Sequence, residues 1–135
     1  MKPTVIDTSF FLPNQQFFAQ SIGYTETLLH THTFFEVFIV DSGDAIHLIN
    51  GKNEKITQNE LVFLRPGDIH TFKYEPQNSF YHTDILFTEK LFAEINNFLS
   101  CEKLNDFLNS PMPFSIKLNT SEVSIIHDYI NKINM

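Results

Sequence analysis

The chain has 135 residues, of which 42% are hydrophobic and 19% charged, with 15 phenylalanines and no tryptophan, so one soluble domain with a phenylalanine-rich core is expected. Nine basic residues stand against 16 acidic ones for a formal net charge of -7, and Arg65 is the only arginine, which excludes a cationic cluster that could hold DNA or RNA. The single cysteine, Cys101, excludes an internal disulfide and is expected as a small buried hydrophobe on a helix. The lack of a signal peptide or a long apolar stretch predicts a cytoplasmic, membrane-free protein.

Residues 1–87 are expected to form strands and turns. Short β-prone runs such as FFEVFIV, ELVFL and FYHTDILF alternate with turn residues at a spacing of roughly ten, which is typical of a small barrel or sandwich. Asn50-Gly51 predicts a type I′ turn between two strands, because both residues tolerate a positive φ.

Residues 88–135 are expected to be mainly helical. Leu91, Ile95 and Phe98 recur at helical spacing, and the pattern resumes after a break near Ser100. Prolines at 111 and 113 end this helical part, and FSIKL then alternates like a short strand.

A final helix is expected to begin at Asn119 or Thr120, either of which can cap it, with Glu122 in its first turn. Aliphatic residues then follow a helical seam at Val123, Ile126, Ile130 and Ile133. The seam predicts packing on a second copy of the chain or on the chain's own domain, and the sequence leaves both open.

The stretch HTHTFFEVFIVDSG, residues 30 to 43, carries the most specific chemistry. Side chains alternate along a strand, so His30, His32 and Glu36 are predicted to share one face with Phe34 and Phe38. A carboxylate there must be wet, protonated, paired or metal-bound, because burying it alone is very unfavourable.

Two imidazoles and a carboxylate, from His30, His32 and Glu36, are ligands that suit Zn, Mn, Fe or Ni. His70, which Pro66-Gly67 delivers into another strand, is the fourth candidate ligand, because three ligands from one strand form only one wall of a site.

The spacing His30-x-His32, three residues, Glu36, six residues, Gly43 resembles the first cupin motif, and Pro66-Gly67-x-x-His70 resembles the second. The second motif departs from the family pattern: its proline directly precedes the glycine, Asn59 stands where a turn glycine is common, and Tyr74 replaces an asparagine. With the later run FYHTDILFTEKLF, the whole is similar to the amino-terminal, effector-sensing domain of AraC-type transcriptional regulators over about residues 24 to 95.

This resemblance implies a mainly β fold, a cupin-type antiparallel β-barrel of the double-sheet jelly-roll kind over residues 1–87. It also implies a helical extension over 88–135 that packs on the barrel and leads to a DNA-binding domain absent from this chain. The metal ligands it implies are His30, His32, Glu36 and His70, with Gly43 as the turn glycine between strands. Whether a divalent metal (Zn, Ni, Mn or Fe) or only a small effector occupies the lumen stays open.

Further residues have two readings each. Phe34 and Phe38 could line a ligand pocket or fill the core. Arg65 could bind an effector carboxylate or hydroxyl groups, or form a surface ion pair. His82 shares a face with Asp84 in a late strand, and both could reach the lumen. His47 and His127 are expected as ordinary surface or helix residues.

The function expected is that of an effector-binding and dimerisation domain of an AraC-type regulator, without enzymatic activity. It would bind a sugar-like molecule or an organic acid, form a homodimer through the final helix, and reach DNA only through the missing domain. The first alternative is a metal-dependent cupin enzyme, of the dioxygenase or isomerase class, using the same four ligands. The second alternative is a stand-alone binding module.

Overall fold

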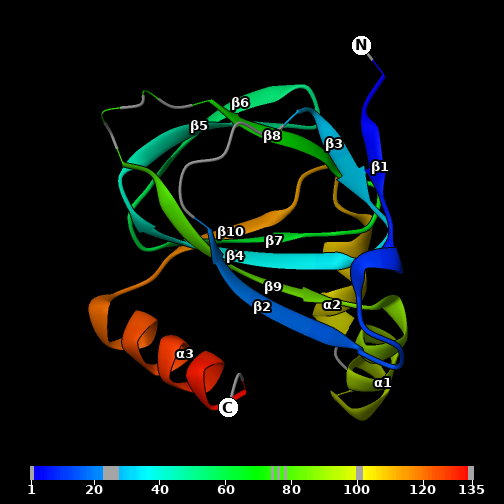
Figure 1. The fold of residues 1–135 in the computed structure, drawn as a ribbon. Helices are drawn as coiled ribbons and strands as arrows, with labels where there is room; N and C mark the ends of the chain where they lie inside the picture. Colours follow the sequence, from blue (N-terminus) through cyan, green and yellow to red (C-terminus); the bar gives the residue numbers. More distant parts are fainter. Residues whose placement is uncertain are drawn as a thin grey trace.

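The computed structural model describes residues 2–22, 28–73, 75, 77, 79–99 and 102–133. Its strands form two five-stranded sheets that face each other, and the helices lie on the outer side of one of them (Figure 1). Sheet A contains, in spatial order, β1 (Thr4–Ile6), β3 (His30–His32), β8 (Ile69–Lys73), β5 (Asp44–Ile49) and β6 (Lys52–Thr57). Sheet B contains β10 (Phe114–Lys117), β7 (Glu60–Leu64), β4 (Phe35–Ser42), β9 (Tyr81–Phe87) and β2 (Phe17–Ile22).

The predicted fold class is confirmed. Neighbouring strands are antiparallel except for β1, which pairs with β3 in parallel. The two sheets stay separate within the described residues, so the architecture is a jelly-roll sandwich rather than a closed barrel. Strand β10, which follows two helices in sequence, returns to pair with β7.

Two turn predictions are also confirmed. Asn50 and Gly51 have φ values of 47° and 80°, and they join β5 to β6 with Ile49 opposite Lys52. Gly43, between β4 and β5, has a φ of 77°, and Asn59 takes the left-handed conformation at 73°. Asparagine tolerates this conformation better than most residues, so the turn survives without a glycine.

Phenylalanine fills the core on both sides of sheet B. Between the sheets, Phe38, Phe72 and Phe80 are buried with the aliphatic residues of β4, β5 and β7. Behind sheet B, Phe92 stacks on Phe35 with ring centroids 4.2 Å apart. Strand β4 is therefore covered on both faces, as its doubly apolar sequence predicts.

The helices are α1 (Glu89–Leu99), α2 (Glu102–Asn109) and α3 (Thr120–Ile133), with a short 3-10 turn, η1 (Thr8–Phe10), near the amino terminus. The first helix is confirmed, but its buried residue is Phe92, whereas Phe98 is 88% exposed. The predicted break near Ser100 and the predicted buried Cys101 lie outside the described residues, as does Tyr74. In the described part of the chain, no helix is long and apolar enough to cross a membrane.

Helix α3 begins where predicted, in a reciprocal capping box. The Glu122 amide donates to Asn119 Oδ1 at 2.9 Å, and the Asn119 amide donates to Glu122 Oε1 at 3.0 Å. Of the predicted seam, Ile130 is buried and both Val123 and Ile126 are half-buried, so these three pack on the chain's own domain. The apolar residues left facing outward are Ile125, Tyr129 and Ile133, which are 55%, 62% and 50% exposed.

Candidate functional site

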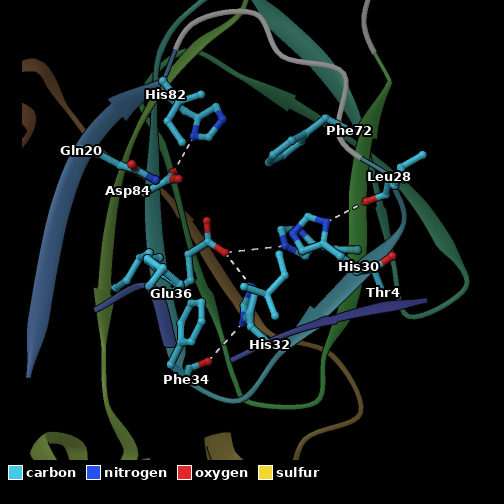
Figure 2. Close-up of a pocket in the computed structure, with 15 residues that line it drawn as sticks. Thr4, Gln20, Leu28, His30, His32, Phe34, Glu36, Phe72, His82 and Asp84 are labelled. Carbon is cyan, nitrogen blue, oxygen red and sulfur yellow. Dashed lines mark hydrogen bonds and ion pairs between the residues drawn. The ribbon is translucent and has the colours of Figure 1, made fainter. Parts of the chain in front are cut away.

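A cavity of about 450 Å³ lies between the two sheets. One part of its wall is apolar and comes from η1 and from strands of both sheets. The polar residues that line it are Thr4, Gln20, His30, His32, Glu36, His70, His82 and Asp84. Figure 2 shows His82 and Asp84 across the cavity from His30 and His32, with the Glu36 side chain reaching in from a third direction.

Strand pairing brings the non-local histidine to the others. His30 of β3 lies directly opposite His70 of β8 in the antiparallel register, and their ring centroids are 4.4 Å apart. Directly opposed residues on one face are the closest side-chain neighbours in a sheet. His70 therefore reaches the site as predicted.

The prediction that His30, His32 and Glu36 share one strand is wrong. The chain bends at Thr33 and Phe34, so the two histidines belong to sheet A and Glu36 belongs to sheet B. Glu36 still points inward, because the inner faces of both sheets border the same cavity. The ligands consequently come from two opposing walls.

Glu36 is held by two histidines. Its Oε2 lies 2.7 Å from Nε2 of His32 and 3.6 Å from Nε2 of His70. Burial acts to raise the pKa of Glu36, but the adjacent His32 and His70 rings outweigh it and hold the pKa well below its usual range. For His32, burial acts to lower the pKa, and the bond and charge of Glu36 reverse the direction and raise it. Both directions favour the ion pair of a His32 imidazolium with the Glu36 carboxylate.

Backbone carbonyls orient two of the imidazole rings. His30 Nδ1 donates to the Leu28 carbonyl at 2.8 Å, and His32 Nδ1 donates to the Phe34 carbonyl at 3.1 Å. A carbonyl oxygen can only accept, so Nδ1 carries a proton in both rings and Nε2 faces the cavity. Burial, and then the neighbouring His70, lower the pKa of His30, which keeps it neutral.

The histidine set fits a metal ion. One ring nitrogen from each of His30, His32 and His70 lies within 4.8 Å of the others. In His32 and His70 the Nε2 atom is buried without a hydrogen bond of good geometry. Imidazole nitrogens whose other nitrogen is held by a hydrogen bond are the usual histidine ligands of Zn, Ni, Mn and Fe, and Glu36 could supply a fourth, anionic ligand.

The opposite wall carries a second buried pair. His82 Nδ1 lies 2.5 Å from Asp84 Oδ1. Burial and the nearby charge of Glu36 raise the pKa of Asp84 to about 7. Burial acts to lower the pKa of His82, but the bond to Asp84 outweighs it, and the net direction is upward.

Six of the eight predicted ligand-binding residues line the cavity: His30, His32, Phe34, Glu36, His70 and His82. The other two, Phe38 and Arg65, do not line the cavity. Phe38 is fully buried in the core beside the cavity. Asp84, Gln20 and Phe72 also line the cavity. Of these, only Asp84 could be predicted from the sequence, because it lies two residues after His82 and so shares its face of the strand.

Arg65 points away from the cavity and is buried rather than on the surface. Its Nε donates to Asp68 Oδ2 at 3.0 Å and its NH2 group to Asp68 Oδ1 at 2.9 Å. Its NH1 group donates to the carbonyls of Phe107 and Ser110. Both readings of Arg65 from the sequence are therefore corrected: it fixes the turn before β8 to the carboxyl end of α2.

The expectation that His47 is an ordinary surface residue is wrong. His47 lies in β5, is 1% exposed, and its Nε2 is 3.0 Å from Nδ1 of His70. Burial, and then the charge of His70, lower the pKa of His47 to about 3, so this ring is neutral. His127, in contrast, lies on α3, where its Nε2 pairs with Asp41 Oδ1 at 2.8 Å.

Comparison with known proteins identifies the family of this domain. A model of the AraC-like ligand binding domain matches residues 14–101. The HTH-type transcriptional activator RhaR of Escherichia coli is 30% identical over 70 residues, which are 50% of this chain and 25% of that protein. The chain thus spans about a quarter of the length of the curated relatives it matches.

The similar solved structures share the fold at low identity. Apo ToxT from Vibrio cholerae matches 88% of this chain and 48% of its own, with a TM-score of 0.65 and 10% identity. ToxT bound to (E)-4-(8-methylnaphthalen-1-yl)but-3-enoic acid matches 88% of this chain and 49% of its own, with a TM-score of 0.61 and 10% identity. At these identities the likeness supports the fold alone.

Proposed function

Because the chain belongs to the family of AraC-like ligand binding domains, we propose that it is the effector sensor of an AraC-type transcriptional regulator. The effector, a sugar-like molecule or an organic acid, binds in the cavity between the sheets. DNA is contacted by a separate domain, and the protein works in the cytoplasm. The share of the RhaR chain that is matched supports a longer whole protein, since only 25% of RhaR is covered.

The observation that carries the proposal is the cavity itself. Its volume of about 450 Å³ suits a small organic molecule, and its wall combines an apolar part with convergent polar groups. The carboxylic acid bound to ToxT supports a small organic ligand in this fold. His30, His32 and His70 from sheet A and Glu36 from sheet B converge at one place in the cavity, where they would meet the polar part of an effector.

The same site could also hold a divalent metal ion together with the effector. His30, His32, His70 and Glu36 would hold it, and the ion would polarise an effector oxygen. The same residues also support the alternative of a metal-dependent cupin enzyme, because the three histidine nitrogens lie within 4.8 Å of one another. A dioxygenase or isomerase predicts stoichiometric metal after purification without a nickel column, together with turnover.

We infer two routes by which an occupied cavity biases the helices. The first runs through the turn before β8. The Gly67 amide donates to the His32 carbonyl at 3.1 Å, and Arg65 in the same turn holds the Phe107 and Ser110 carbonyls beyond the sheet. A shift of His32 on binding therefore reaches the segment between α2 and β10.

The second route runs through β9. Thr83 lies between His82 and Asp84, and its side chain points to the other face of the strand. There its hydroxyl donates to Asp41 Oδ2 at 2.6 Å, and Asp41 pairs with His127 of α3. Binding can shift the helices only by its difference in affinity between two arrangements, typically about 1–3 kcal/mol.

We also propose that the outward row of α3 forms the homodimer contact. Ile125, Tyr129 and Ile133 recur every four residues and remain at least half exposed. A row with this spacing runs along one side of a helix and suits a second helix. A change in the position of α3 would then alter the distance between attached DNA-binding domains.

The proposal is tested by calorimetric titration of a panel of sugars and organic acids. At least one compound should bind the wild type and fail to bind a His32→Ala variant. His127→Ala is the matched control, because it removes a histidine outside the cavity. A panel in which no compound distinguishes His32→Ala from the wild type would count against the sensor.

A further inference from the structure

Asn50 makes contacts that its place in the turn between β5 and β6 does not require. Its φ of 47° suits either asparagine or glycine, so the backbone alone needs no side chain there. The side chain is nevertheless half-buried and hydrogen-bonded at both of its polar atoms. Its Oδ1 accepts from the Ile69 amide at 2.9 Å, and its Nδ2 donates to Asp68 Oδ1 at 2.8 Å. Asn50 therefore holds the two residues directly before His70.

These contacts extend the pairing of β5 with β8 by one residue. The ladder ends with Ile49 opposite His70, and the Asn50 amide continues it by donating to the Ile69 carbonyl at 2.9 Å. Inside an antiparallel ladder, the return bond from the Ile69 amide would go to the Asn50 backbone carbonyl. The chain turns away at Asn50, and its side-chain oxygen takes the place of that carbonyl. One residue thus makes both hydrogen bonds that hold the start of β8.

Asp68 connects this contact to the helical part of the chain. Its Oδ1 accepts from Asn50 at 2.8 Å and from the NH2 group of Arg65 at 2.9 Å. The NH1 group of Arg65 in turn donates to the carbonyls of Phe107, in α2, and Ser110, just beyond it. Asp68 and Arg65 are buried, so water competes little for these bonds. The start of β8 and the carboxyl end of α2 are therefore tied to one carboxylate.

We propose that Asn50 is a positioning residue that fixes the start of β8, and with it the place of His70 in the cavity, relative to the carboxyl end of α2. His70 directly follows Ile69, and its ring lies beside that of His30, with centroids 4.4 Å apart. A shift of β8 on binding moves Asp68 and, through Arg65, the end of α2. This link begins at β8 itself and so differs from the route through His32. The link rests on the proposed function, whereas the positioning of β8 does not.

The acceptor of the Ile69 amide can be identified in the wild-type protein, without any ligand, by NMR detection of scalar coupling across hydrogen bonds. We expect a correlation between the Ile69 amide nitrogen and the side-chain carbonyl carbon of Asn50. The ladder bond from the Asn50 amide to the Ile69 carbonyl is the internal reference in the same spectrum. Detection of this reference without the side-chain correlation would overturn the positioning role, even if every variant failed to fold.

Asn50→Gly removes the side chain and keeps a residue that tolerates the positive φ. The Ile69 amide should then exchange with solvent on the order of tenfold faster, because it loses its acceptor. The carbon-bound ring protons of His70 should change their NMR shifts, because the start of β8 is no longer fixed. The Ser110 amide, which donates to the Phe107 carbonyl at 3.2 Å, should also exchange faster, because Arg65 holds that end of α2 less firmly.

Asn59→Gly is the matched control. Asn59 is also half-buried in a turn and has a φ of 73°, but within the described part of the chain its side chain makes no hydrogen bond. The two variants therefore lose the same side chain from the same type of backbone conformation. Asn59→Gly should leave the exchange of Ile69 and Ser110 and the ring signals of His70 at their wild-type values.

Wild-type exchange of Ile69, or unchanged ring signals of His70, in a folded Asn50→Gly variant would overturn the positioning role. Equal changes in Asn59→Gly would do the same, because they would follow from the loss of any turn side chain. Faster exchange of Ile69 with an unchanged Ser110 would reject the link to α2 and keep the positioning role. Failure of the effector screen would reject the sensor function and leave the NMR result standing.

Discussion

Breaking the Arg65–Asp68 pair should be among the most destabilising single changes outside the apolar core. Both side chains are nearly inaccessible, at 9% and 6% of their surface, and two parallel N–H bonds join them. Arg65→Met removes the cation but keeps a side chain of similar length. Among the described residues, Asp68 would then keep two donors, the backbone amide of residue 65, at 2.7 Å, and the Asn50 side chain, at 2.8 Å.

The expected cost follows from the buried charge left behind. Removing one partner of a buried ion pair costs about 3–5 kcal/mol. A domain of this size has a total stability of about 5–15 kcal/mol, so the variant should be close to unfolding or strongly weakened. Adding Asp68→Asn to Arg65→Met should recover part of the loss, because the unpaired charge is then gone.

The matched control is an ion pair in a different environment. Lys55 and Asp44 lie 3.7 Å apart, with side chains 66% and 39% exposed. Lys55→Met should therefore cost less than about 1 kcal/mol. Urea unfolding followed by circular dichroism measures all these variants. If Arg65→Met lost no more stability than Lys55→Met, the reasoning that burial decides the value of this pair would be refuted.

Two further predictions concern Asp84 and α3. The folded protein holds the pKa of Asp84 at about 7, above the ordinary 3.8, so folding takes up a proton and stability should fall as pH rises between those values. In chelator-treated protein, Asp84→Asn should make the stability depend less on pH, and urea unfolding at a series of pH values measures this. An unchanged dependence of stability on pH would show that another group titrates. In analytical ultracentrifugation the wild type should be a dimer and Ile125→Asp with Tyr129→Asp a folded monomer. Ser124→Asp with Asn131→Asp, exposed positions on other sides of the helix, should remain dimeric, and a monomeric wild type would contradict the dimer.

Local signals in the sequence predicted the elements well. The Asn50-Gly51 turn and the Asn119 cap depend on a few adjacent residues, whose conformational preferences act without the rest of the fold. The alternation in residues 30–40 also predicted which side chains face inward. It did so although the chain changes sheets at Thr33 and Phe34, because both sheets turn their inner faces to one cavity.

Contacts between residues that lie far apart in the chain could not be predicted from the sequence. Arg65 binds carbonyls of Phe107 and Ser110, more than 40 positions away, and no local pattern encodes that contact. The burial of His47 could have been predicted, because His47 lies on the same face of β5 as the buried Ala45 and Ile49. Only its partner, His70, depends on the pairing of β5 with β8.

The outward row of α3 shows a related limit. Periodicity identified an apolar seam, and three of its residues turned out to serve the chain's own core. Which apolar positions remain for a partner depends on where the helix docks, through the pair between His127 and Asp41. That docking is a tertiary property.

The central claim is that four side chains from two opposing sheets surround a site that takes up a small molecule or an ion. A crystal structure of protein purified without a metal-affinity column, with anomalous scattering recorded to identify any ion, tests it most directly. We predict density in the cavity within contact distance of His30, His32, Glu36 and His70. Protein side chains packed into that space, or a Glu36 carboxylate turned to bulk solvent, would contradict the account.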